Sequence, residues 1–321
     1  MNESDLAGRQ VFITGATGFV GANLARRLIA SGAEVHALVR GSADRWRIGE
    51  IAEQMSLHEG DLLEPESLRR VMAVAQPEMI FHLAIEGGHP SESGAKKSMM
   101  ETSVVGTLNL LEEAEKTSYS SFVHVSSSLV YGRREEPLRE DDLLRPVTFR
   151  GAAKAGADLL CLQFARERQR PVVILRLFSV YGYWEQPGRL IPTAIEAAHN
   201  GTKMSITPRG CKHDLVFVAD VVRACLLAGC APDLGGEVIN IGSGVQWDNQ
   251  DVVRLVEKVT GRAINYGSEP YPLRVVDSSH WVADITKARR LLGWRPTFTL
   301  AQGLAKMLEW FENHSKYYEV R

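Results

Sequence analysis

The sequence predicts an α/β protein, because short strand-like runs of apolar residues alternate with stretches of helical periodicity. The first such run, 11–13, is followed by a glycine-rich turn and then by a segment, 22–30, whose apolar residues fall at helical spacing. Further strand-like runs follow along the chain at 33–39, 57–62, 79–84, 122–125 and 172–178. A strand, a glycine turn and a helix in succession form the context that a dinucleotide-binding fingerprint needs.

Length and composition limit the class of protein. The 321 residues suffice for one large domain or two modest ones, and 45% hydrophobic and 24% charged residues are typical of a soluble globular protein. A formal charge of −2 gives no reason to expect nucleic acid or an anionic membrane surface as a partner. The polar N-terminus is unlike a signal peptide, and no apolar run approaches the ~20 residues that span a bilayer. No cysteines have CxxC spacing, so we expect no metal site, no disulfide framework and a cytoplasmic location; the cysteines are Cys161, Cys211, Cys225 and Cys230.

The glycine turn is the first candidate site. Gly15 would let the chain turn tightly, Gly18 would let the backbone approach a pyrophosphate, and Gly21 would let the helix pack closely on the strand. The helix N-terminus that follows favours anions. We therefore predict a dinucleotide site, with an ordinary glycine turn as the alternative. The cofactor contacts expected here are Gly15, Thr17, Gly18, Phe19, Val20 and Gly21.

The end of the second predicted strand, 33–39, bears on the choice of cofactor. An acidic residue at this place binds the 2′-hydroxyl of NAD, whereas an arginine can pair with the 2′-phosphate of NADP. The chain has Arg40 here, with Ser42 as a second phosphate donor. We therefore expect NADP(H), with NAD(H) possible; the alternative is that Arg40 is a solvated surface residue.

The motif Thr-Gly-Ala-Thr-Gly-Phe-Val-Gly at 14–21 resembles the extended branch of the short-chain dehydrogenase/reductase superfamily, which contains nucleotide-sugar epimerases, dehydratases and reductases. Matching motifs continue to Pro296. The resemblance implies a doubly wound parallel sheet (Rossmann) with a smaller α/β C-terminal substrate domain. It places a dinucleotide-binding domain at 1–178, which also receives parts of 214–245, and a discontinuous substrate-binding domain at 179–321. It also implies a homodimer that forms through the helices near 104–115 and 152–168.

The same resemblance implies further cofactor contacts beyond the glycine turn. Asp61 and Leu62 would border the adenine, although Asp61 could instead cap the helix after Pro65. Leu83 and Ala84 would lie beside the pyrophosphate and ribose, and His82 before them is expected to be a packed histidine rather than a metal ligand. The remaining cofactor contacts are Lys154, Phe178 and Val180.

The predicted catalytic residues are Ser127, Lys154 and Arg150. Ser127 matches the catalytic Ser/Thr of the family when counted back from Gly132, and Lys154 matches the lysine of its Tyr-x-x-x-Lys motif. Arg150 stands where the family has its tyrosine, the general acid/base. A guanidinium cannot give up a proton near neutral pH, so Arg150 would instead stabilise an anion. Ser127, Tyr131 or a water molecule would then handle the proton.

Other departures from the family pattern fall in the same predicted pocket. Ser103 and Ser179 replace asparagines, and His213 replaces an arginine. A Gly/Ser/Lys-rich stretch at 87–98 is interpreted as a lid over the substrate. The substrate contacts that we predict are Ser128, Ser179, Trp184, Arg209, His213 and Arg274, with core packing as the alternative for Trp184.

Taken together, these residues predict an NADP(H)-dependent oxidoreductase that acts on a nucleotide-linked (deoxy)sugar, as a 4-keto-sugar reductase. The alternatives are a nucleotide-sugar 4-epimerase with bound NAD(P), a catalytically impaired dinucleotide-binding sensor or scaffold, and a reductase of a non-sugar carbonyl. The Asp-Glu pair that 4,6-dehydratases carry after the catalytic Ser/Thr is replaced by Ser128 and Leu129, which argues against a dehydratase.

Overall fold

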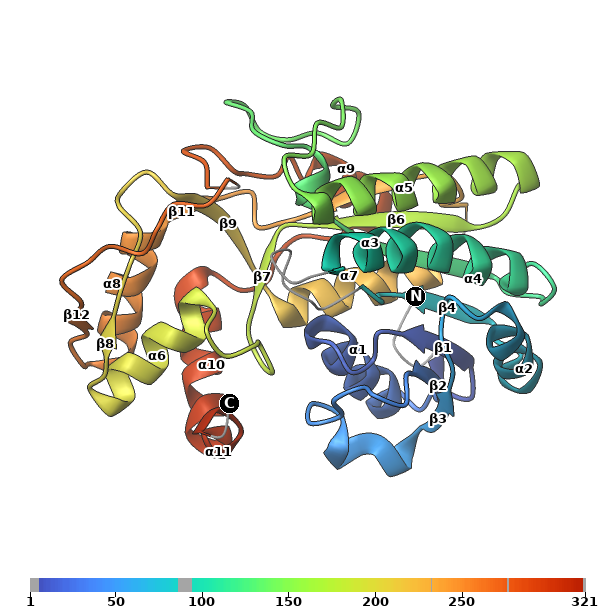
Figure 1. Cartoon of the computed structure of the whole chain (residues 1–321), viewed down its shortest axis with the longest axis horizontal. Helices are drawn as coiled ribbons and strands as arrows, with labels where there is room; N and C mark the ends of the chain where they lie inside the picture. Colours follow the sequence, from blue (N-terminus) through green and yellow to red (C-terminus); the bar gives the residue numbers. More distant parts are fainter. Residues whose placement is uncertain (1–5, 86–93, 232, 276, 320–321) are drawn as a thin grey trace.

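A computed structural model describes residues 6–85, 94–231, 233–275 and 277–319 (Figure 1). Its centre is a seven-stranded sheet in the order β10-β6-β5-β4-β1-β2-β3, in which every pairing is parallel. The strands are β1 Gln10–Thr14, β2 Glu34–Val39, β3 Ser56–Glu59, β4 Met79–His82, β5 Ser121–Ser127, β6 Val172–Leu177 and β10 Val238–Ile241. The order reverses between β1 and β4, which is where ligands bind in folds of this kind.

Helices cover both faces of this sheet, and each face has its own apolar core. On one side α1 Phe19–Ala30 and α7 Val218–Cys230 bury Leu24 and Val221. On the other side α2 Pro65–Ala75, α4 Gly106–Ala114 and α5 Phe149–Arg168 bury Leu68, Leu110 and Cys161. Burial on both faces explains why the strands are almost continuously apolar. The predicted doubly wound parallel sheet is confirmed.

The long helical segment before β5 contains a π-helical turn. It runs through α3 Ala95–Met100, the π-helix η3 Glu101–Val105 and α4, and Ser103 lies buried on the π turn. The stretch 87–98, which we interpreted as a lid, is therefore helical from Ala95 onward, and Ala95 is buried. The part of this predicted lid at 87–93 lies outside the described residues.

The C-terminal part of the chain forms a smaller layer with its own core. Its three-stranded sheet contains β7 Ser179–Tyr181, β9 Lys212–Phe217 and β11 Gln246–Asp248, and a second pair is β8 Lys203–Met204 with β12 Asn265–Tyr266. The remaining helices are η2 Gly49–Gln54, η4 Ser128–Val130, α6 Leu190–Asn200, α8 Asn249–Thr260, α9 Thr286–Leu292, α10 Leu300–His314 and α11 Lys316–Glu319. Between β9 and β11 the chain returns to the large sheet as α7 and β10 (Figure 1).

Within the described ranges, none of the helices combines the length and the apolar character that a bilayer crossing requires. The same residues contain no group of three or more His, Cys, Asp or Glu side chains that could hold a metal ion.

Candidate active site

The glycine turn after β1 has the close packing that the fingerprint predicts. Gly15 has a φ of +78°, and a Cβ there would stand 2.7 Å from the backbone nitrogen of Ala84. A Cβ on Gly21 would overlap the carbonyl oxygen of Gly15. Gly18 is the N-cap of α1 and offers no side chain to its amides, and the first turn of α1 has no acidic residue. These amides are therefore available to an anion, and the cradle fits the pyrophosphate of a dinucleotide.

The end of β4 is held by a buried polar chain. The Nδ1 atom of His82 lies 2.6 Å from Thr14 Oγ1, and its Nε2 atom lies 2.8 Å from Thr107 Oγ1. Burial lowers the pKa of His82 well below its usual value, so the ring is neutral. The interpretation of His82 as a packed strand-end histidine agrees with this geometry. These hydrogen bonds fix the backbone at Leu83, whose amide donates to the carbonyl oxygen of Thr14 at 3.0 Å.

The edge formed by the ends of β2 and β3 carries charges of both signs. Arg40 is exposed directly after β2, and a Cβ on Gly41 would stand 2.7 Å from Oε1 of Glu59. A carboxylate therefore lies beside the predicted phosphate contact. Asp61 accepts from the amide of Leu63 at 2.9 Å, and α2 has Glu64 as its N-cap. The alternative that Asp61 caps α2 is wrong, since its carboxylate closes an Asx turn instead.

Ser127 ends β5 at the carboxyl edge of the sheet. Its Oγ atom accepts a hydrogen bond of 3.2 Å from the amide of Leu129 and caps η4. Ser128 is buried, and its hydroxyl accepts from Nε1 of Trp281 at 3.1 Å. A Cβ on Gly151 would stand 2.5 Å from the carbonyl oxygen of Leu129, so the start of α5 lies directly against this turn.

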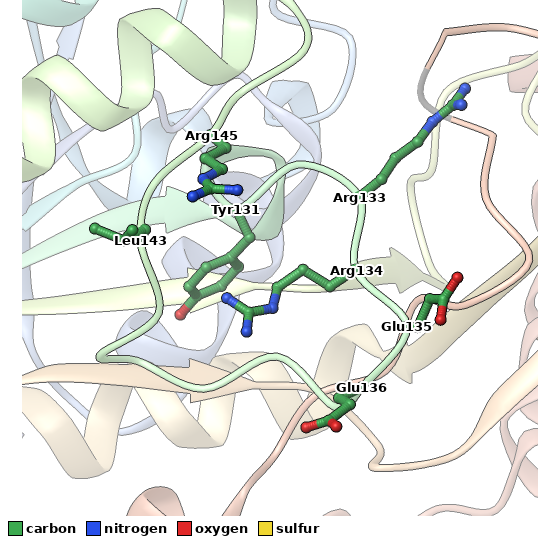
Figure 2. Close-up of a pocket in the computed structure, with 7 residues that line it drawn as sticks. All are labelled: Tyr131, Arg133, Arg134, Glu135, Glu136, Leu143 and Arg145. Carbon is green, nitrogen blue, oxygen red and sulfur yellow. The ribbon is translucent and has the colours of Figure 1, made fainter.

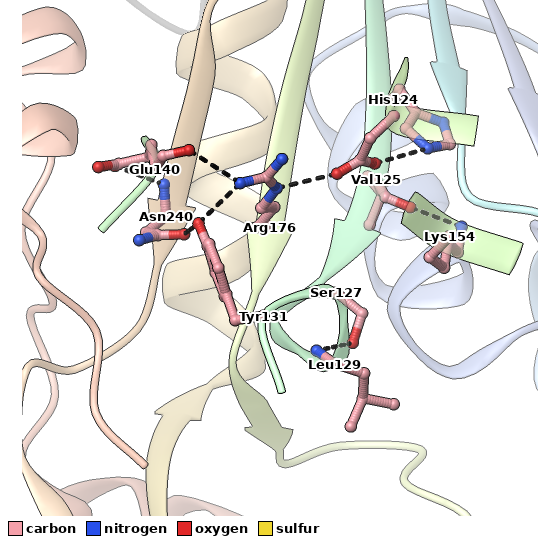
Figure 3. Close-up of polar contacts among 10 residues, drawn as sticks. His124, Val125, Ser127, Leu129, Tyr131, Glu140, Lys154, Arg176 and Asn240 are labelled. Carbon is pink, nitrogen blue, oxygen red and sulfur yellow. Dashed lines mark hydrogen bonds and ion pairs between the residues drawn. The ribbon is translucent and has the colours of Figure 1, made fainter. Parts of the chain in front are cut away.

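Lys154 and Arg150 stand one turn apart at the start of α5. Lys154 is only 4% exposed, and its Nζ atom donates to the carbonyl oxygen of Val125 at 2.8 Å (Figure 3). Burial lowers the pKa of Lys154 to about 8; the positive charge of Arg150 acts in the same direction, whereas Asp158 opposes it. A lysine with this pKa can exchange a proton near neutral pH.

Tyr131 is unsuited to proton transfer. Its ring is fully buried, its hydroxyl donates to Asn240 Oδ1 at 2.6 Å, and it accepts from Arg176 Nη1 at 3.0 Å (Figure 3). Burial raises the pKa of Tyr131 far above its ordinary value. The suggestion that this tyrosine handles the proton is wrong, because its hydroxyl is committed to a structural network.

Two of the predicted substrate residues meet between β7 and β9. Ser179 Oγ lies 3.4 Å from Nδ1 of His213. Burial, with the nearby charge of Arg274, lowers the pKa of His213 to about 4, so this ring is neutral at neutral pH. The position at which the resembling family has an arginine therefore carries no positive charge.

Arginines gather around a cavity of about 250 Å³, and two residues of its lining, Arg274 and Asp277, act electrostatically on His213. Arg209 and Arg274 line it together with Asp277, and so does Arg133 from the segment after η4. Arg209 pairs with Asp251 at 2.9 Å, and Arg274 pairs with Asp277 at 3.2 Å. Arg133 could not be identified from the sequence, because nothing in its spacing connects it with Arg274, which lies about 140 residues later.

The segment 131–145 bounds a second cavity of about 460 Å³, and Figure 2 shows the side chains that line it. Arg133 also lines this cavity and is thus common to both. The full lining is Tyr131, Arg133, Arg134, Glu135, Glu136, Leu143 and Arg145.

Trp184 does not lie open to a nucleotide base. Its ring is 2% exposed and contacts Trp46, Trp310 and Tyr317, with the guanidinium of Arg26 at 4.1 Å over its face. The predicted substrate contact is wrong, and the packing alternative is correct, because residues from both ends of the chain cover this indole. Phe178, a predicted cofactor contact, is also buried, whereas Val180 is half-buried.

A parallel sheet with a glycine cradle at its switch point defines a dinucleotide-binding α/β protein. Residues 11–242 match the NAD dependent epimerase/dehydratase family, and the chain belongs to this family. The predicted family membership is thereby confirmed. The predicted preference for NADP over NAD is not supported, because the matching family is described as NAD dependent.

Relatives of different activity are similar to nearly the whole chain. A UDP-glucose 4-epimerase of Mycolicibacterium smegmatis is 31% identical over 96% of this chain and 100% of its own length. A dTDP-glucose 4,6-dehydratase of Streptomyces griseus is 30% identical over 96% of each chain. A crystal structure shows a UDP-glucuronic acid 4-epimerase from Bacillus cereus in complex with UDP-glucuronic acid and NAD. It has a TM-score of 0.83 and 26% sequence identity to this chain, over 95% of this chain and 99% of that one. Overall identity therefore does not distinguish epimerase from dehydratase.

Proposed function

We propose that this protein is a nucleotide-sugar 4-epimerase that works without a catalytic tyrosine. The observation that carries the proposal is the buried Lys154, which lies behind the end of the strand that carries Ser127. The similarity to a UDP-glucose 4-epimerase over the whole of that protein supports the same activity. In this proposal Arg150 occupies the place of the family's tyrosine.

The cradle of Gly15, Gly18 and Gly21 would hold the pyrophosphate, and Leu83 and Ala84 would border it. The further contacts in this proposal are Thr17, Phe19, Val20, Arg40, Ser42, Asp61, Leu62, Phe178 and Val180. A bound nicotinamide would supply hydride-transfer chemistry at the sugar carbon. Side chains of the protein would bind the sugar, transfer its proton and stabilise the oxyanion.

Ser127 and Lys154 transfer the proton of the C4 hydroxyl in this proposal. Ser127 binds the C4 hydroxyl of the sugar, and neutral Lys154 accepts its proton, directly or through Ser127. Arg150 stays charged and stabilises the developing oxyanion. Return of the hydrogen to the opposite face of C4, together with return of the proton from Lys154 to the C4 oxygen, would restore the hydroxyl with inverted configuration.

A 4-keto-sugar reductase is the second candidate, and Arg40 favours it. An exposed arginine after β2 suits the 2′-phosphate of NADP, which reductases release and replace after each turnover. Glu59, beside Gly41, works against this preference by repelling the same phosphate. A dehydratase is disfavoured because Ser128 and Leu129 offer neither acid nor base.

The domain division at 178 and 179 and the homodimer also remain proposals. Large apolar side chains on the outer face of the long helical segment and α5 support the dimer, because they are exposed in a single chain. They are Met100, Val105, Leu108 and Leu159.

Product analysis tests the proposed function. The purified protein, loaded with NAD, is incubated separately with UDP-glucose, UDP-glucuronic acid and dTDP-glucose, and the products are identified by NMR. We expect inversion at C4 in at least one sugar with no net reduction of NAD. Oxidation of NADPH by a 4-keto nucleotide sugar, without inversion, would instead establish the reductase. Tight dinucleotide binding with no conversion in either assay would favour the sensor.

A further inference from the structure

We propose that Arg133 supplies the positive charge that binds the substrate diphosphate, in place of the arginine that β9 lacks at His213. The proposal rests on the proposed function, because it assumes a nucleotide-linked substrate. It assigns a binding role to a residue that lies outside every motif of the chain.

The backbone directs Arg133 toward the arginine-lined cavity. Gly132 has a φ of +75°, and a Cβ there would overlap the carbonyl oxygen of Arg145. A residue with a side chain would be strained at Gly132, so the sharp turn depends on glycine. Figure 2 shows that Arg133 leaves this turn pointing away from Tyr131 and Arg145. Its Nη2 atom donates to the carbonyl oxygen of Val275 at 2.7 Å, next to the segment that carries Arg274.

The charges around the cavity leave Arg133 as the cation that is not neutralised. Three guanidinium groups face one carboxylate in the lining, that of Asp277. Arg274 is paired with Asp277, and Arg209 is paired with Asp251 just outside the lining. Among the residues that the structure describes, no carboxylate forms an ion pair with Arg133. A diphosphate diester is doubly negative, and a planar guanidinium with free N–H groups is well suited to bind it.

The pair of Ser179 and His213 leaves β9 without a cation at this position. Both lie on the C-terminal side of this region, and neither carries a positive charge at neutral pH. Arg133 enters from the opposite side, four residues after Leu129 of the turn that begins at Ser127. A diphosphate bound between Arg133 and Arg274 would therefore join the two parts of the chain and bring the attached sugar toward Ser127.

Binding measurements on the intact protein loaded with NAD test the proposal. The dissociation constants of UDP and dTDP are compared with those of uridine and thymidine for the wild type and for Arg133→Ala. We expect the variant to bind the diphosphates about tenfold or more weakly and the nucleosides unchanged, since a charge-assisted hydrogen bond is lost. Arg134→Ala is the matched control, because Arg134 pairs with Asp142 and does not line the cavity of about 250 Å³. It should change the constants by about twofold at most.

A second variant tests the replacement itself. Adding His213→Arg to Arg133→Ala should recover most of the lost diphosphate affinity, because the charge returns from β9. Equal diphosphate binding by Arg133→Ala and the wild type would overturn the proposal and leave the proposed function standing. The proposal would also be overturned if Arg133→Ala lost affinity for the nucleosides by the same factor as for the diphosphates. Failure of the wild type to bind either diphosphate, with dinucleotide still bound, would refute the nucleotide-sugar substrate and this inference with it.

Discussion

Nζ of Lys154 donates a hydrogen bond of 2.8 Å to the carbonyl oxygen of Val125, two residues before Ser127 on the same strand. The lysine is thereby held in the interior, directly behind the end of β5. A buried ammonium group that donates to a backbone carbonyl is costly to keep charged. Because of this contact, we assign Lys154 as the group that accepts the proton of the sugar's C4 hydroxyl.

The rate of turnover should rise with pH through about 8. The lysine must be neutral to accept the sugar's proton, and burial lowers its pKa to about 8. Arg150→Gln removes a positive charge that lowers this pKa, so the midpoint of the pH–rate profile should move to higher pH. The exposed Arg166 near the far end of α5 is the control, and Arg166→Gln should leave the midpoint in place. A midpoint that does not respond to Arg150→Gln would contradict the assignment.

Gly21→Ala should abolish dinucleotide binding and destabilise the fold by about 1–3 kcal/mol, since a Cβ there would overlap the carbonyl of Gly15. Gly49→Ala is the matched control, because nothing lies within 4 Å of a Cβ at that position. Chemical denaturation and NAD titration of both variants measure the two effects. Normal NAD affinity in Gly21→Ala would show that the turn is not the cofactor cradle.

Much of the fold could be predicted because its signals are local. Apolar runs mark the strands, and the glycines of 14–21 mark the turn. The errors concern residues whose surroundings come from distant segments. Trp184 is covered by Trp46 and Trp310, and Tyr131 is held by Asn240, contacts that no local pattern encodes.

The candidate site was predicted unevenly for the same reason. Ser127, Arg150 and Lys154 fall within short motifs, and the structure brings the turn of Ser127 against the helix of the other two. Arg133 has no motif, and its place beside Arg274 depends on how the chain folds back after β11. Arg133 could be found as a cation near His213 only once the path of the chain after β11 was known.

The stability of the protein should fall as the pH drops below 6.5, in part because of His213. Above pH 6.5 this histidine is neutral in both the folded and the unfolded state, so it adds no pH dependence there. Below pH 6.5 the unfolded chain binds a proton that the folded state, with a pKa of about 4, does not bind. The histidine should therefore cost about 2 kcal/mol at pH 5.

Urea unfolding of the wild type and His213→Gln at pH 7.5 and pH 5 measures this contribution. The variant should lose less stability between the two pH values, by about 2 kcal/mol. The same loss in both proteins would mean that His213 is protonated in the folded state.

Arg40 and Glu59 should set the choice of dinucleotide. Arg40→Ala should weaken NADP binding by about tenfold and leave NAD binding unchanged, because only NADP has the 2′-phosphate. Glu59→Gln should strengthen NADP binding, because it removes a negative charge beside Gly41. Titration of each variant with both dinucleotides gives the four constants. If Arg40→Ala affects NAD and NADP equally, Arg40 is a surface residue with no part in this choice.

The central claim is that a nicotinamide dinucleotide binds in the cradle of Gly15, Gly18 and Gly21. Mass spectrometry of the small molecules released by gentle denaturation of the purified protein, with and without prior addition of NAD and NADP, tests it most directly. We predict release of about one dinucleotide per chain from the wild type and none from Gly21→Ala. A wild-type protein that releases no dinucleotide even after both have been added would contradict the account.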